Sequence, residues 1–153
     1  MAILLNDISR RLATPPQPFS FGAVHVAEFV YDASAGLLAA DIVDIGVLPA
    51  GCRFVDATFS ADASLGAANV NVGILSGEIG DLNQGGRTLG TELFAAAAIT
   101  NAHTSVVRMS NPAGFALAAN KTTHRSIGLQ VSANIAAGAG KVIRLFVEYR
   151  QVS

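Results

Sequence analysis

The stretch KVIRLFVEYR, residues 141–150, alternates between apolar and polar side chains over most of its length. Side chains of a β-strand point alternately to opposite faces, so a period of two predicts a strand with one buried face. Phe146 departs from the pattern, because it is an aromatic residue on the face that carries the charges. We expect four side chains to point inward, namely Ile143, Leu145, Val147 and Tyr149.

Six further segments on the N-terminal side of this stretch are also predicted to be strands. Two of them, NVNVGIL at 69–75 and SIGLQVSA at 126–133, repeat the alternation clearly. The remaining candidates are residues 23–31, 39–47, 53–60 and 104–110. Breaks that contain Gly, Asn, Asp or Pro separate the segments, and many short strands joined by such turns are typical of a β-sandwich or barrel. The predicted fold class is therefore all-β.

The segment TELFAAAAIT, residues 91–100, is the exception to this strand pattern because it contains four consecutive alanines. Alanine is the most favourable residue in helices and is depleted in strands. We therefore expect one short helix near residues 91–98.

The opening stretch MAILLNDISRRLATPPQP, residues 1–18, places Leu4, Ile8 and Leu12 four residues apart. This spacing would align the three side chains on one face of a short helix, and helices of this length rarely persist unaided in water. We interpret residues 1–18 as an N-terminal arm that becomes ordered on a partner; the alternative is a frayed terminus. The residues predicted to bind the partner are Leu4, Leu5, Ile8, Leu12 and Phe146.

The composition is unusually poor in charge. Hydrophobic residues make up 51% of the chain and charged residues only 14%, whereas about 25% charged residues is typical of soluble domains. Because monomeric proteins normally keep exposed apolar patches small, we expect a homo-oligomer, a trimer or a dimer, or docking on a larger body.

Charge and hydropathy also exclude some partners. The formal net charge of −1 lacks the excess of Lys and Arg that phosphate contacts require, so no nucleic-acid partner is expected. The longest apolar run, residues 93–99, is far below the roughly 20 residues that span a bilayer, so no membrane segment is expected. A single cysteine excludes an internal disulfide, and no secretion signal precedes it, which indicates a protein made in the cytosol.

The chemistry-bearing residues do not form a catalytic pattern. Cys52 follows Pro49 and Gly51, the residues of a tight turn, so it is expected to begin a strand as a small hydrophobic residue rather than as a nucleophile. The three histidines, His25, His103 and His124, have no metal-ligand spacing. We therefore expect no enzyme activity, no catalytic residues and no cofactor.

The segment DLNQGGRTLGTE, residues 81–92, partly fits the twelve-residue calcium-loop template. Asp81, Asn83, Gly86 and Glu92 stand at the positions that the template requires, but Gly85 replaces an oxygen ligand. The segment before the loop is predicted to be a strand and not the helix that an EF-hand needs. We interpret the loop as an ordinary turn, with no metal site.

Several segments together resemble the jelly-roll capsid cement, or decoration, proteins of tailed bacteriophages. These are DIGVLPAGCRF, NVNVGIL, LGTELFAAAAIT and HRSIGLQVSANIAAGAGKVIRLFVEYR, and the resemblance spans roughly residues 24–150. It implies a jelly-roll-like β-sandwich, which we assign to residues 19–153. The short helix and the N-terminal arm over residues 1–18 come from the residue patterns above, and the arm lies outside the resemblance. The resemblance also implies a structural protein of the virion, assembled in the host cytoplasm, which binds the outer capsid surface as an oligomer and bridges major capsid protein subunits.

Other functions stay open at this point. A head-tail connector or tail subunit would also be a virion protein, and the sequence does not separate it from a cement protein. A carbohydrate- or receptor-binding jelly-roll module is less favoured, because aromatics make up only 7% of the chain and Trp is absent. A small enzyme on a cupin-like barrel would need a cluster of His and Glu ligands, and no such cluster is visible in the sequence.

Overall fold

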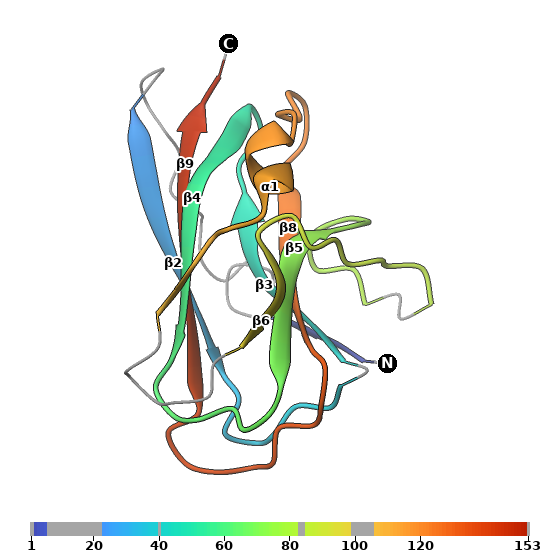
Figure 1. Cartoon of the computed structure of the whole chain (residues 1–153). Helices are drawn as coiled ribbons and strands as arrows, with labels where there is room; N and C mark the ends of the chain where they lie inside the picture. Colours follow the sequence, from blue (N-terminus) through green and yellow to red (C-terminus); the bar gives the residue numbers. More distant parts are fainter. Residues whose placement is uncertain (1, 6–22, 40, 83–84, 99–105, 153) are drawn as a thin grey trace.

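Two β-sheets and one short helix form the structure, a computed structural model that describes residues 2–5, 23–39, 41–82, 85–98 and 106–152. The sheets face each other as a sandwich, with strand orders β1-β3-β8-β5-β6 and β2-β9-β4-β7 (Figure 1). The elements are β1 (Ile3–Leu5), β2 (Val24–Asp32), β3 (Ile42–Leu48), β4 (Cys52–Ala61), β5 (Asn69–Leu75), β6 (Phe94–Ala98), β7 (Val107–Arg108), α1 (Pro112–Ala116), β8 (Arg125–Val131) and β9 (Val142–Gln151).

The strand pairing follows the jelly-roll order. Strand β2 pairs with β9, β3 with β8, β4 with β7 and β5 with β6, all antiparallel, as in one long hairpin. Rolling that hairpin brings β4 against β9 and β5 against β8, which divides the strands between two sheets. This arrangement of eight strands in two sheets confirms the predicted all-β, jelly-roll-like sandwich.

The core lies between the two sheets. The four β9 side chains predicted to point inward are all buried, each at most 1% exposed. They face the buried side chains of the opposite sheet, including Ile127, Leu129 and Val72, in one cluster. The alternation of residues 141–150 therefore identified the inner face of the central strand correctly.

The predicted helix near residues 91–98 is wrong, because Phe94–Ala98 forms strand β6. Helix propensity favours alanine by less than 1 kcal/mol per residue over most residue types, and tertiary pairing overrides it here. The strand pairs with β5, buries Phe94 and passes through a positive φ of 51° at Ala96. The Ala96 amide donates a hydrogen bond to Asn71 Oδ1 at this irregularity.

The short helix of the described chain is α1, in a segment that the sequence pattern assigned to a break between strands. Asn111 caps it by accepting a hydrogen bond from the Ala113 amide, and Pro112 occupies the first turn. An Asn cap followed by Pro is a standard helix start, so the signal was present in the sequence.

The N-terminal residues 3–5 form a strand that pairs in parallel with β3. The helical assignment is therefore wrong at Leu4, which packs on the main core. Ile8, Leu12 and the rest of residues 6–22 lie outside the described residues.

A second apolar cluster lies on the other face of strand β3. It contains Ile3, Ile42 and Leu75, with Leu5 and Leu89 packed against it. Leu89 belongs to the connection between β5 and β6 (Figure 1), where it forms an isolated antiparallel bridge with Leu75. A Cβ on Gly128 would come within 2.6 Å of the Leu89 side chain, so a larger residue there would displace Leu89. Strand β3 is consequently buried on both faces.

The turn between β3 and β4 has the predicted form. Gly51 adopts a φ of 75°, and the Cys52 amide donates a hydrogen bond to the Pro49 carbonyl. Cys52 begins β4 and is fully buried. Burial raises the pKa of its thiol, which is the opposite of what a nucleophilic cysteine needs.

Truncation of the inner face of β9 tests this packing. Leu145→Ala should lower the free energy of unfolding by about 2–5 kcal/mol, because it removes a fully buried side chain from the centre of the sandwich. The matched control is Leu38→Ala, which makes the same chemical change at a residue that is 58% exposed and should cost less than about 0.5 kcal/mol. Equal losses in chemical denaturation would contradict the assigned inner face.

Candidate interaction surfaces

Strand β2 presents exposed apolar side chains at the edge of its sheet. Val24, Val26 and Val30 are 49%, 56% and 41% exposed. Among the described residues, β2 forms a strand ladder with β9 alone, so its other side is an edge. Edge strands in soluble proteins are usually protected by charges, prolines or bulges. A nine-residue edge with three exposed valines favours contact with another protein surface.

The middle of the same outer face is charge-balanced. Arg144 bridges Glu28 on β2, at 3.0 Å, and Asp62 beyond the end of β4, at 2.9 Å, and the hydrogen bonds to these carboxylates raise its pKa. Arg108 on β7 pairs with Asp56 on β4. Phe146 lies between these pairs, in register with Glu28 and Thr58. The charged side chains of these ion pairs therefore neutralise one another within this part of the face.

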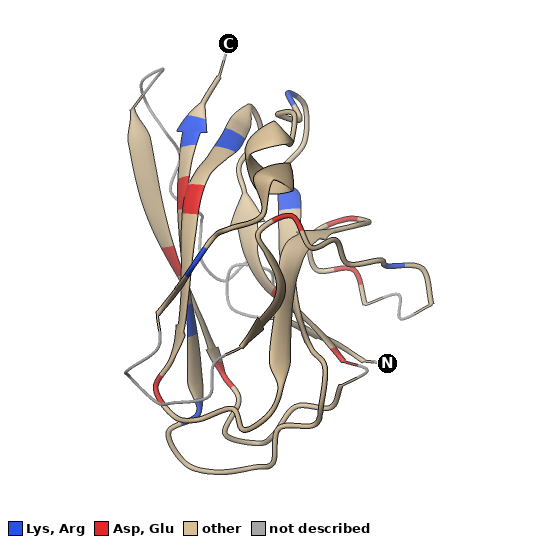
Figure 2. Cartoon of the chain, viewed as in Figure 1, with Lys and Arg blue, Asp and Glu red and all other residues tan. Residues whose placement is uncertain are grey.

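The end of the sandwich that carries α1 differs, because cations gather there. Figure 2 shows bands of positive charge on β4, β8 and β9 near α1, with the acidic bands of β4 and β9 further from that end. The cations of this end are Arg53, Lys121, Arg125 and Arg150. Arg53 and Arg150 are directly opposite each other on neighbouring strands.

A pocket of about 450 Å³ opens at this end. Its lining combines the two opposed arginines with apolar side chains from β2, β4 and α1. One of these, Phe115, is 50% exposed. The lining residues are Val24, Arg53, Phe54, Val55, Phe115 and Arg150.

Hydrogen bonds fix the segments around the pocket. Arg53 Nη2 donates to the Phe115 carbonyl at 2.8 Å, which joins β4 to α1. Asn111 Nδ2 donates to the Thr91 carbonyl, and Gly114 packs so closely on Glu92 that a Cβ would lie 2.7 Å from its carbonyl oxygen. The helix is therefore held in one position relative to the sheets.

The turn at the end of β3 is joined to the loop after α1. The Gly51 amide donates to the Asn120 carbonyl at 2.7 Å, and the Ala50 amide donates to His124 Nδ1 at 3.0 Å. Arg125 Nη2 donates to the Ala118 carbonyl at 3.0 Å. These hydrogen bonds join the β3–β4 turn, the loop after α1 and the start of β8 at the α1 end of the sandwich.

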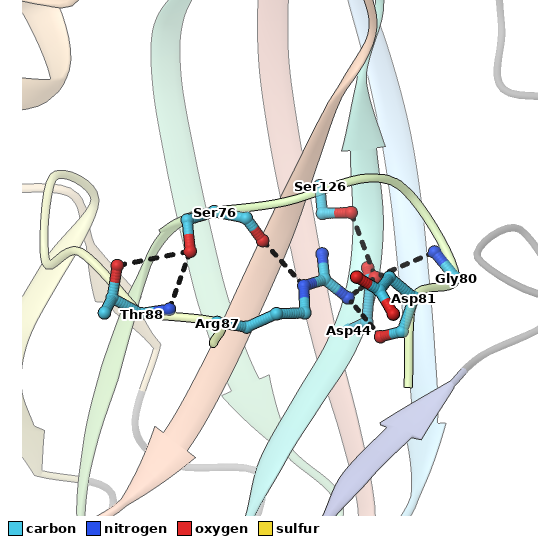
Figure 3. A network of polar contacts seen from close by, with 7 residues as sticks. All are labelled: Asp44, Ser76, Gly80, Asp81, Arg87, Thr88 and Ser126. Carbon is cyan, nitrogen blue, oxygen red and sulfur yellow. Dashed lines mark hydrogen bonds and ion pairs between the residues drawn. The ribbon is translucent and has the colours of Figure 1, made fainter. Parts of the chain in front are cut away.

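A buried ion pair attaches the connection between β5 and β6 to the sheet (Figure 3). Arg87 Nη1 lies 2.9 Å from Asp44 Oδ2, and the two side chains are 1% and 0% exposed. Ser126 Oγ donates to the same carboxylate oxygen at 2.9 Å. Arg87 also donates to the carbonyls of Ser76 and Asp81. One guanidinium thus joins the first part of the loop, at Ser76 and Asp81, to β3.

The partial calcium template over residues 81–92 has a different organisation from an EF-hand. Glu92 Oε2 accepts a hydrogen bond from the Ile74 amide at 2.8 Å, and its carboxylate lies against Gly73 and Gly90. The carbonyl of Asp81 is bound to Arg87, and Asn83 lies outside the described residues. Within the described ranges, no group of three His, Cys, Asp or Glu side chains is placed to hold a metal ion. The same part of the chain contains no helix with the length and hydropathy of a membrane span.

The structure does not bring the sequence-predicted partner residues together. Leu4 and Leu5 are partly buried in β1, whereas Phe146 lies on the outer face of the other sheet. Ile8 and Leu12 lie outside the described residues. Contact of these five residues with a partner stays a prediction.

The exposed valines and the arginine pair were missed by sequence analysis. The valines had a visible signal, because β2 carries Val24, Val26 and Val30 on one face and Ala27 and Phe29 on the other. No sequence signal indicated the arginine pair, since it depends on the register between two strands far apart in the sequence.

Comparisons with known proteins connect this fold to viral shells. No protein-family model matches the sequence, and no curated protein matches it. A chain from the capsid of Ralstonia phage GP4 is 32% identical over 99% of both chains, with a TM-score of 0.89. A chain of the cyanophage Pam1 capsid asymmetric unit is 23% identical over 96% of this chain and 97% of that one, with a TM-score of 0.63. A chain from the acidic stable capsid of Helicobacter pylori bacteriophage KHP30 is 12% identical over 88% and 92%, with a TM-score of 0.54. The last two show similarity of fold alone.

Removal of one partner from the buried ion pair tests the attachment of the loop. Asp44→Ala should destabilise the protein by about 3–5 kcal/mol, because it leaves the Arg87 guanidinium buried without its counter-charge. Glu78→Ala is the control, since it removes an exposed acid from the same loop and should change stability by less than about 0.5 kcal/mol. Similar midpoints of urea unfolding for the two variants would show that the pair does not hold the loop.

Proposed function

Because the chain belongs to a family of bacteriophage capsid proteins, we propose that it is a cement protein that binds the outer capsid surface as an oligomer and bridges major capsid subunits. The observation that carries the proposal is the match over 99% of both chains to a chain of the Ralstonia phage GP4 capsid. That chain is part of a viral shell, and the same fold recurs in two other phage capsids. The role is structural rather than catalytic.

The exposed edge of β2 supports a bridging role, because copies joined along this edge would present several shell-binding surfaces at once. Covering the exposed part of each valine would contribute about 1 kcal/mol, a modest amount for one contact. A protein that contacts two shell subunits at once gains affinity from the second contact, because that contact forms within the complex. Many weak contacts of this kind, repeated over a shell, oppose separation of neighbouring subunits.

The charge-poor composition supports the oligomer. Only 14% of residues are charged, and the acids and bases in the middle of the β2-β9-β4-β7 face pair with each other. Like copies can therefore approach along the β2 edge without strong repulsion of net charge. Closed assemblies such as dimers and trimers bury such an edge in every copy.

The mass of the purified protein tests the oligomer. We expect a dimer or a trimer at micromolar concentration by light scattering. Val26→Lys should convert it to monomers without lowering the melting temperature, because the side chain is 56% exposed and the new amine lies directly opposite Glu148. Leu38→Lys, at a residue that is similarly exposed but lies in a loop after β2, should leave the oligomer intact. A monomeric wild-type protein would contradict the oligomer.

Particles with and without the protein test the cement function. Particles that lack it should release their DNA at a lower temperature, because neighbouring subunits have lost a bridge, and purified wild-type protein should restore the higher temperature. A dye that fluoresces on exposed DNA measures the release, and electron microscopy should show many copies on the outer surface. Copies confined to a single vertex would identify a connector or tail subunit instead, and no change in DNA release would contradict a cement role.

A further inference from the structure

We infer that the pocket beside α1 binds a carboxylate-bearing, partly apolar segment of the capsid partner, an inference that rests on the proposed function. The pocket combines two features that a ligand could use together. One is a pair of opposed arginines, and the other is an exposed apolar lining that includes Phe115. An acidic side chain next to an aliphatic one matches both features.

The pair of opposed arginines supports a carboxylate ligand more strongly than the apolar lining does. Residues directly opposite each other on antiparallel strands have Cβ atoms about 5 Å apart, and like charges at such positions are unfavourable. Arg53 and Arg150 are in this relation. Within the described residues, the Arg150 side chain has neither a hydrogen bond nor an ion pair and is exposed to solvent. A carboxylate placed between the two guanidinium groups would relieve their repulsion.

On the same outer face, the nearest acid of β4 pairs with a different cation, Arg108. Asp56 and Glu148 are opposite each other in the next outward-facing row of β4 and β9. Asp56 pairs with Arg108, whose pKa is raised chiefly by that pair and further by the charge of Glu148. Asp56 is therefore paired with Arg108, and the row of Arg53 and Arg150 contains no acid of its own.

Arg53 is already oriented for a ligand. Its Nη2 donates to the Phe115 carbonyl, which fixes the plane of the guanidinium at the wall of the pocket. An arginine has five N–H donors, so further donors are available to a carboxylate. A group fixed in advance loses less side-chain entropy when it binds.

The apolar lining and the size define the rest of the ligand. Val24, Val55 and Phe115 border the arginines, and a volume of about 450 Å³ holds a short stretch of chain. A lining of this kind favours an aliphatic side chain next to the acid. Nucleic acid fits less well, because phosphate binding draws on extended basic surfaces and the chain has a net charge of −1. The segment before β2 also fits less well, because residues 6–22 contain Arg10 and Arg11 and only one acid.

A peptide titration tests the chemistry of the pocket without the capsid. The probe is a terminally blocked Glu-Leu-Glu-Leu peptide, and its control is Gln-Leu-Gln-Leu. We expect the acidic peptide to shift the amide resonances of Val24, Val55 and Phe115 in the wild-type protein. Arg150→Gln, which removes no hydrogen bond within the described protein, should weaken binding by about ten- to a hundredfold. Equal shifts with both peptides, or no effect of Arg150→Gln, would overturn the inference.

Capsid binding tests whether the partner uses the pocket. Shells lacking the protein should bind Arg53→Gln and Arg150→Gln variants about tenfold or more weakly than wild type, with unchanged melting temperatures for Arg150→Gln. Lys141→Gln, which removes a cation just before β9 at the opposite end of the sandwich, should bind normally. In Arg150→Lys, a carbodiimide should link the new amine to an Asp or Glu of the shell, and the linked peptide can be sequenced by mass spectrometry.

The outcomes separate the two proposals. Failure of wild type to bind shells would contradict the cement function, and the peptide titration would still decide the chemistry of the pocket. Normal shell binding by both arginine variants would overturn the pocket inference while leaving the cement function in place. Binding of duplex DNA that is lost in Arg150→Gln, with shell occupancy unchanged, would identify a phosphate site and also overturn the inference.

Discussion

The pairing of β9 with β2 on one side and β4 on the other is the contact on which the rest of the structure depends. It brings the first and last strands of the jelly roll together and closes the eight-strand arrangement. Its inward side chains fill the middle of the core. Its outward side chains place Arg150 between Val24 and Arg53, so one strand both stabilises the sandwich and builds the pocket.

Sequence patterns predicted the strands whose two faces have different surroundings. Residues 141–150 and 69–75 bury one face, so their alternation was visible. Strand β6 was missed because four alanines favour a helix, and only pairing with β5 decides against it. The burial of β3 on both faces could not be predicted from periodicity, because its second cover comes from β1, from Leu75 of β5 and from Leu89, in a loop that Arg87 holds.

The candidate surfaces could not be predicted from short sequence patterns, because they depend on the order and register of strands that are far apart in the chain. Phe146 was visible as an apolar residue among charges, and it does lie on the outer face. The exposed valines of β2 looked like ordinary strand residues until the sheet order made β2 an edge. Arg53 and Arg150 are 97 positions apart, and only the register of β4 with β9 makes them neighbours. Short motifs suggested a capsid protein, and the match over 99% of both chains to a chain of the Ralstonia phage GP4 capsid confirmed it.

The position of β9 between two antiparallel neighbours has a mechanical consequence. Inter-strand hydrogen bonds in antiparallel pairs run perpendicular to the strands. A pull along β9 from the α1 end therefore strains both ladders at the same time, in shear, instead of breaking their bonds one after another. Ladders of nine residue pairs on each side share that load. A load applied at this end would be carried by both ladders as a unit, and failure would require the central strand to slide past both neighbours.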